Sequence, residues 1–187
     1  MLKRIVVSGV LGTLVMTAWA FVANAIFGMR PRLEMMRVSD ESAVHRVLTE
    51  NVRGPGAYVV NPPAPRPGEP PGPGPVYGIR FSGVGHESAG RLQALHLAIT
   101  FLASALAAWM LCGVAGRPPA RYVRRVLFFV AIGALFALLG NLAKFDIAGY
   151  PLETAIIFGA SDLIAWTLAG LAIAGWLRPA PLVESPA

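Results

Sequence analysis

The chain has 187 residues, of which 55% are hydrophobic and only 14% are charged, and its mean hydropathy is +0.59. Soluble domains carry about a quarter charged residues, so this composition excludes most soluble enzyme folds. The net charge of +6 and the pI near 10.2 would indicate a nucleic-acid partner in a soluble protein. Here most basic residues flank long apolar runs, so no nucleic-acid binding is predicted.

Four long apolar runs occupy residues 5–27, 92–116, 126–143 and 154–177. A helix of about 20 residues crosses the ~30 Å hydrocarbon core, and hydrocarbon does not satisfy open backbone groups. We therefore predict an all-α membrane protein with four transmembrane helices in contact with the lipid bilayer. The third run is the shortest, and we expect Tyr122 and Lys144 at its ends to reach the two interfaces.

The basic residues around these runs predict the orientation of the helices. Lys3 and Arg4 precede the first run, four arginines lie between residues 117 and 125, and Arg178 follows the last run. Under the positive-inside rule, both termini should be cytoplasmic, in the inner membrane of a bacterium. The predicted organisation is a first transmembrane helix (1–27), a periplasmic Pro/Gly-rich loop (28–91), and three further helices with a short cytoplasmic tail (92–187).

The first run also resembles a secretory signal, because two basic residues precede it and Ala23-Asn24-Ala25 ends it. Its apolar stretch exceeds the 7 to 15 residues of a signal core. We therefore expect an uncleaved membrane anchor.

The predicted external loop contains a short helix and a hairpin. Residues 39–51 begin with Ser39, Asp40 and Glu41 and continue with apolar residues at helical spacing, which predicts an amphipathic helix against the bundle or the lipid headgroups. Residues 58–60 and 76–81 have strand-like composition and predict a small β-hairpin. A lone hairpin is marginally stable, so it should dock on the bundle or on another subunit.

A proline-rich tract separates the two predicted strands. Nine of the sixteen prolines fall between Pro55 and Pro75, interleaved with glycines. Such a sequence does not form helix and favours extended or polyproline conformations.

The order of these features resembles an uncharacterised family of small bacterial four-helix inner-membrane proteins with a long first external loop. The resemblance rests on residues 7–12 with Trp19, 40–44, 56–60 with Pro62, 125–128, 149–151, and Asp162 with 165–166 and 168–172. It covers nearly the whole chain and implies the four-helix architecture. No activity is assigned to the family, so the resemblance implies none for this chain.

Polar residues within the spans gather toward one side of the membrane. With alternating helix directions, a set of six lies in the outer half of the bundle: Asn24, His96, Thr100, Asn141, Lys144 and Asp162. Asp162 enters about 12 Å from the outer end of the fourth helix. A carboxylate at this depth needs partners, and we expect Asn141 and Lys144 to supply them.

Small residues on the third and fourth helices predict how these two helices meet. Gly133, Ala137 and Asn141 share a face of the third helix, and Gly159, Trp166 and Ala169 share a face of the fourth. Small residues allow close helix approach. We expect the two faces to pack together.

The polar layer has two interpretations. It forms either a pocket for a quinone headgroup, a small substrate or a proton path, with Asp162 and His96 as ionisable members, or it provides hydrogen bonds between helices. Structural hydrogen bonding is the simpler of the two.

No catalytic or metal-binding motif is apparent. His45, His86 and His96 have no partner at ligand spacing, and the lone Cys112 excludes thiol oxidases that need cysteine pairs. No nucleophile with a base, and no phosphate-binding glycine loop after a strand, is found. We predict no enzyme activity, no metal and no cofactor bound by this chain alone.

Three functional hypotheses follow. The first is a non-catalytic accessory subunit that packs against larger membrane-complex partners, respiratory or photosynthetic, with the proline-rich loop as a docking arm. The alternative is a small carrier or a protein binding a quinone, lipid or pigment in the polar layer, as a homo-oligomer. A third is a membrane enzyme using His96 and Asp162.

Overall fold

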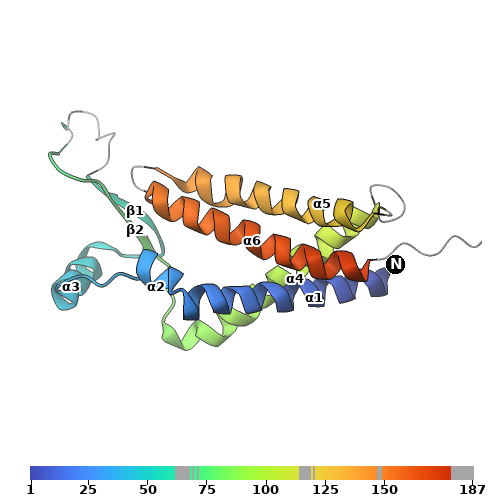
Figure 1. The fold of residues 1–187 in the computed structure, drawn as a ribbon. Coiled ribbons are helices and arrows are strands. Elements are labelled where there is room, and N and C mark those ends of the chain that lie inside the picture. The colour runs from blue at the N-terminus through green and yellow to red at the C-terminus, as the bar shows by residue number, and fades with distance from the viewer. Residues whose placement is uncertain are drawn as a thin grey trace, which may run out of the picture.

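In the computed structural model, the described residues are 1–61, 68, 70, 72–113, 119, 121–146 and 149–177. Four long helices form one elongated bundle, as Figure 1 shows. They are α1 (Leu2–Phe21) with its π-helical extension η1 (Val22–Ile26), α4 (Ala89–Gly113), α5 (Tyr122–Leu135) with its π-helical extension η3 (Phe136–Asn141), and α6 (Leu152–Trp176). A short 3-10 turn, η4 (Leu142–Lys144), ends the third span. The predicted all-α membrane architecture is confirmed.

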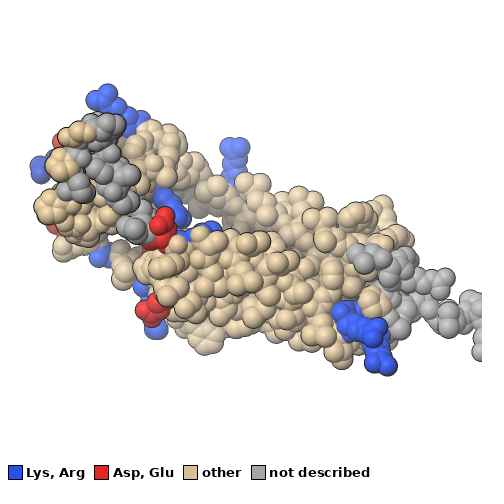
Figure 2. All heavy atoms as spheres, turned by 90° about the horizontal axis from the view of Figure 1, so that it is seen from above, with Lys and Arg blue, Asp and Glu red and all other residues tan. Residues whose placement is uncertain are grey.

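Each of the four helices is long and apolar enough to cross a membrane. The third span runs from Tyr122 to Lys144 and has 23 residues rather than the 18 predicted, because Arg124 and Arg125 interrupt the apolar run without ending the helix. It is therefore not short. Figure 2 shows a broad uncharged surface over most of the bundle. The predicted end of the second span and the predicted tail lie outside the described residues.

The helices pack in the order α4, α1, α6, α5, with α1 contacting both α4 and α6. A side chain on Gly12 of α1 would overlap Ser104 of α4. On the other side, a Cβ on Gly133 of α5 would lie 2.8 Å from Trp166 Cβ, and a Cβ on Gly159 would lie 3.4 Å from the Ala137 carbonyl oxygen. The predicted contact between the small faces of the third and fourth helices is confirmed.

The apolar core lies in one half of the bundle, toward the end that holds Met1 and Trp176, here called the terminus end. Its members include Leu111 and Cys112 of α4, Phe129 of α5, and Ile173 of α6, all buried. At the opposite end, here called the loop end, α4 diverges from α5 and α6 (Figure 1). From Ala89 to Ala103, α4 has no buried residue. The two ends of the bundle are thus packed differently.

The segment between η1 and α4 forms two short helices, a small sheet and a 3-10 turn, η2 (His86–Ser88), before α4 begins. The short helices are α2 (Met29–Leu33) and α3 (Glu41–Asn51), and the sheet consists of β1 (Gly56–Val60) and β2 (Tyr77–Phe81). The strands pair antiparallel, with Tyr58 opposite Ile79, so the predicted hairpin is confirmed. Most of the proline-rich tract between the strands lies outside the described residues.

The short helix α3 begins at Glu41, two residues after the predicted start at Ser39. Asp40 is the N-cap, and its carboxylate accepts a hydrogen bond from Ala43 N at 2.9 Å, so the cap is Asp40 rather than Ser39. Aspartate and serine are comparable caps, and the sequence alone did not separate them. The apolar side chains Val44 and Val47 remain exposed, because α3 stands clear of the helical bundle (Figure 1).

Candidate functional site

A polar cavity of about 400 Å³ lies at the loop end, between all four long helices. Its lining includes every one of the six polar residues singled out from the sequence: Asn24, His96, Thr100, Asn141, Lys144 and Asp162. Helix rise and alternating direction place these residues at one depth, and the divergence of α4 leaves space between them. The cavity lining therefore joins side chains from α1, α4, η3 and α6.

The centre of the cavity holds an amide–carboxylate pair. Asn141 is buried, and its Nδ2 donates a hydrogen bond of 2.7 Å to Asp162 Oδ2. The predicted partnership between these two residues is confirmed. Lys144, the other expected partner of Asp162, lines the same cavity but makes no ion pair with it among the contacts of the described residues. The Lys144 ammonium is exposed.

Two π-helical segments shape the cavity wall. η1 contributes Ala23 and Asn24, and η3 contributes Phe136 and Asn141. A π-turn inserts a residue, which rotates the following side chains and loosens the regular backbone bonding. Asn24 Nδ2 donates to the Ala20 carbonyl oxygen at 2.8 Å. Both π-helical segments occur where their helices line the cavity. Such segments are frequent at functional sites.

Aromatic side chains form much of the remaining wall. Trp19 Nε1 donates to Ser161 Oγ at 3.0 Å and to the Ser161 carbonyl oxygen at 3.1 Å, which joins α1 to α6. Trp166 and Phe136 rings lie 5.4 Å apart between centroids. Buried indole N–H groups normally need such a partner. The wall is therefore apolar in bulk and polar at a few fixed points, as is common in ligand sites.

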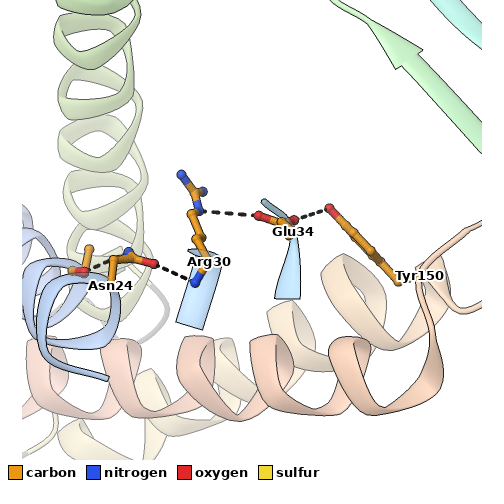
Figure 3. A network of polar contacts seen from close by, with 5 residues as sticks. Asn24, Arg30, Glu34 and Tyr150 are labelled. Atoms are coloured by element: carbon orange, nitrogen blue, oxygen red, sulfur yellow. Dashed lines mark hydrogen bonds and ion pairs between the residues drawn. The ribbon is translucent and has the colours of Figure 1, made fainter. Parts of the chain in front are cut away.

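The outer rim of the cavity is closed on one side by a polar network (Figure 3). Asn24 Oδ1 accepts from the backbone N of Arg30 at 3.3 Å, and Arg30 Nε lies 3.6 Å from Glu34 Oε2. Tyr150 OH donates to Glu34 Oε1 at 2.6 Å, and the Arg80 guanidinium lies 5.1 Å from the centre of the Tyr150 ring. The network links η1 and α2 to the α5–α6 connection and to the hairpin.

The α5–α6 connection is a tight turn that brings Lys144 and Tyr150 together. Tyr150 N donates to the Lys144 carbonyl oxygen at 3.1 Å. Any side chain on Gly149 would overlap that same carbonyl oxygen. Glycine is therefore needed here for close backbone approach.

Three charged or phenolic residues of the rim, Arg30, Glu34 and Tyr150, were not among the predicted site residues. Arg30 and Glu34 are four residues apart, which is a common spacing for a helical ion pair. That spacing was the only local signal. The Tyr150–Glu34 bond joins positions 116 residues apart, and no periodicity predicts such a contact.

The hydrogen bond to Glu34, followed by partial burial, raises the pKa of Tyr150 above its ordinary value of 10.0. A raised folded-state pKa means that this contact stabilises the rim fully below pH 10 and is lost as the pH rises through the folded-state value. We expect Glu34→Gln to lower the pKa of Tyr150. Spectrophotometric titration of tyrosinate, with Tyr150→Phe subtracted, measures it; an unchanged pKa would contradict the bond.

Among the described residues, no three His, Cys, Asp or Glu side chains lie close enough together to hold a metal ion. No protein-family model matches the sequence, and no curated protein or solved structure is detectably similar to it. The chemistry of the cavity is thus the main basis for a functional proposal.

Proposed function

We propose that this chain is a small ligand-binding membrane protein whose site is the polar cavity at the loop end. The observation that carries the proposal is the convergence of six intramembrane polar residues, from all four helices, on one cavity of about 400 Å³. Helix-to-helix hydrogen bonding alone needs no such space. Cavities of a few hundred Å³ with apolar walls and a few polar groups are typical of small-molecule sites.

The polar groups of the cavity leave hydrogen-bonding capacity for a ligand. Asp162 Oδ2 accepts from Asn141, and an ionised carboxylate has a second oxygen that also accepts. Thr100 Oγ1 donates a hydrogen bond to the backbone carbonyl oxygen of His96. This bond does not involve the imidazole ring of His96. Polar side chains inside a membrane bundle are expensive and usually mark a functional pathway or site. A small carrier would bind the compound that it transports in the same cavity.

The Asp162→Asn variant tests this proposal, because asparagine keeps the acceptor for Asn141 and removes only the charge. We expect a melting temperature close to that of the wild type and binding weakened by about tenfold or more, since a hydrogen bond to a charged group contributes about 1.5–3 kcal/mol. Mass spectrometry of solvent extracts from the purified protein measures the ratio of bound compound to chain.

Thr167→Val is the matched control, because Thr167 lies on the same helix and its hydroxyl bonds to Leu163 O at 2.7 Å. This control should retain the bound compound. A variant Asp162→Asn that is unstable while still retaining the compound, or a wild type carrying none, would refute a ligand-binding role.

A second proposed function is that of a non-catalytic accessory subunit in a larger membrane complex. It is supported by α3, which stands clear of the bundle (Figure 1), and by the exposed side chains of Val44 and Val47 on it. Exposed apolar side chains outside the membrane favour a protein partner. Purification in mild detergent should then yield stoichiometric partner subunits, whereas a pure monomer or homo-oligomer would argue against this role.

We also propose a bacterial inner-membrane location with both termini in the cytoplasm. Lys3, Arg4, Arg121 and Arg124 at the terminus end support this orientation. The family resemblance of the sequence supports the same location. With this orientation the cavity and the hairpin lie on the periplasmic side.

A further inference from the structure

The cavity has an open side between two helices, and that side faces the bilayer. Ile99 of α4 and Phe136 of η3 line the cavity and are still 55% and 47% exposed. Because no residue of α4 between Ala89 and Ala103 is buried, this half of α4 does not seal against α5. In a membrane, the space beside Ile99 and Phe136 is occupied by lipid chains.

The side of the cavity nearest the water is more strongly obstructed. Glu34 bonds to Arg30 and to Tyr150, so charged and phenolic groups span from α2 to the α5–α6 connection (Figure 3). A ligand from water would have to pass this network, whereas a ligand from lipid would pass only Ile99 and Phe136. Apolar edges offer little barrier to a hydrocarbon tail.

The charges around the cavity compensate each other. Arg30 and Lys144 are cationic, Glu34 and Asp162 are anionic, and these four residues sum to zero with His96 neutral. A ligand with a net charge would leave one charge uncompensated at membrane depth, which is costly. A neutral headgroup with oxygen atoms has no such cost and accepts hydrogen bonds from the Lys144 ammonium.

We propose that the cavity takes a neutral, bilayer-dissolved amphiphile that enters sideways between α4 and η3. Its head carries a hydroxyl group that donates to Asp162 and accepts from Lys144, and its tail extends past Ile99 and Phe136 into the lipid. This inference rests on the proposed ligand-binding function and adds the route and the ligand class. A substituted hydroquinone and a neutral diacylglycerol both carry such a hydroxyl and share this chemistry.

The route is tested by thiol labelling of the full chain in lipid nanodiscs. Thr100→Cys places a thiol in the cavity and loses only a hydroxyl bond within its own helix. The reference is Leu102→Cys, a lipid-facing site on the same helix that is 64% exposed in the wild type. We expect a maleimide carrying a dodecyl chain to label Thr100→Cys at a rate within about tenfold of its rate with Leu102→Cys. A sulfonated, water-soluble maleimide should label exposed Val59→Cys but react at least about ten times more slowly with Thr100→Cys.

Two controls keep the labelling result interpretable. The wild type reports the background from buried Cys112. Ala103→Cys, which also lines the cavity, replaces Thr100→Cys if the latter does not fold. Faster labelling of the cavity thiol by the water-soluble reagent than by the dodecyl reagent would overturn the sideways route.

The ligand class is tested by protection of the cavity thiol. The probes are a fully substituted hydroquinone with a decyl tail, the same hydroquinone without the tail, and dioleoylglycerol, all kept under anaerobic conditions. We expect one of the two tailed probes to slow dodecyl-maleimide labelling of Thr100→Cys at least about threefold without slowing that of Leu102→Cys. The probe that protects the thiol shows which of the two ligand classes the cavity binds.

Equal protection by the tail-less hydroquinone, or no protection by either tailed probe, would overturn the proposed ligand class. These failures are distinct from a failure of ligand binding itself. If solvent extraction of the wild type still finds a bound compound that Asp162→Asn lacks, the proposed function stands without the sideways route or the neutral amphiphile.

Discussion

Replacing Arg125 with leucine is expected to lower the free energy of unfolding by about 3 kcal/mol, because the change leaves buried carbonyl groups without their charged donor. Arg125 is only 4% exposed although it lies in the first turn of α5. Its Nε donates to the Ala174 carbonyl oxygen at 3.0 Å, and its Nη1 donates to the Pro119 carbonyl oxygen at 2.6 Å. Ala174 lies in the last turn of α6, where carbonyls lack helical partners and a nearby cation is favourable.

Arg124→Leu is the matched control for this prediction, because Arg124 is adjacent and exposed. It should change stability by less than about 0.5 kcal/mol. Arg125→Lys should fall between the two, since an ammonium keeps the charge but lacks the planar fork that reaches two separate carbonyls. Denaturation in mixed micelles, followed by circular dichroism, measures all three; equal stability of Arg124→Leu and Arg125→Leu would show that the buried contacts contribute nothing.

Gly170→Ala is expected to destabilise the bundle by about 2 kcal/mol through overpacking at the α5–α6 contact. A Cβ on Gly170 would lie 2.5 Å from Phe129 Cβ and 3.1 Å from Phe129 Cγ. Phe129 is fully buried, so its ring has no free space into which to move. The helices must separate to admit the methyl group.

Gly175→Ala separates this packing effect from helix propensity, because Gly175 belongs to the same helix and a Cβ there has open space within 4 Å. Alanine is a better helix former than glycine by about 1 kcal/mol, so Gly175→Ala should be neutral or stabilising. The same micelle denaturation compares the two variants. A loss of stability of the same size in both would point to the backbone and not to Phe129.

Most of the architecture follows from physical constraints that act locally along the chain. Apolar runs of membrane length must be helical, which predicted the four spans, and alternating direction then placed Asn24, Asn141 and Asp162 in the outer half of the bundle. The spacing of Gly133 and Gly159 predicted which faces of the third and fourth helices meet. These inferences needed only periodicity and length.

Other features depend on contacts that no local pattern encodes. Arg125 was assigned to a polar connection, because an arginine near a span end usually reaches water; the structure instead places it in the bundle on the end of α6. The π-turns at Asn24 and Asn141 have no propensity signal. The rim residues Glu34 and Tyr150 are 116 residues apart, and the turn before α2 is made by Gly28 with a left-handed φ of 63°.

Cysteine labelling of intact cells measures most directly on which side of the membrane the hairpin and the cavity lie. After permeabilisation of the outer membrane, a sulfonated maleimide should label Val59→Cys in the hairpin at once. Leu2→Cys, at the terminus end and 76% exposed in the wild type, should react only after the inner membrane is opened. Labelling of Leu2→Cys in intact cells, with Val59→Cys protected until lysis, would contradict the account.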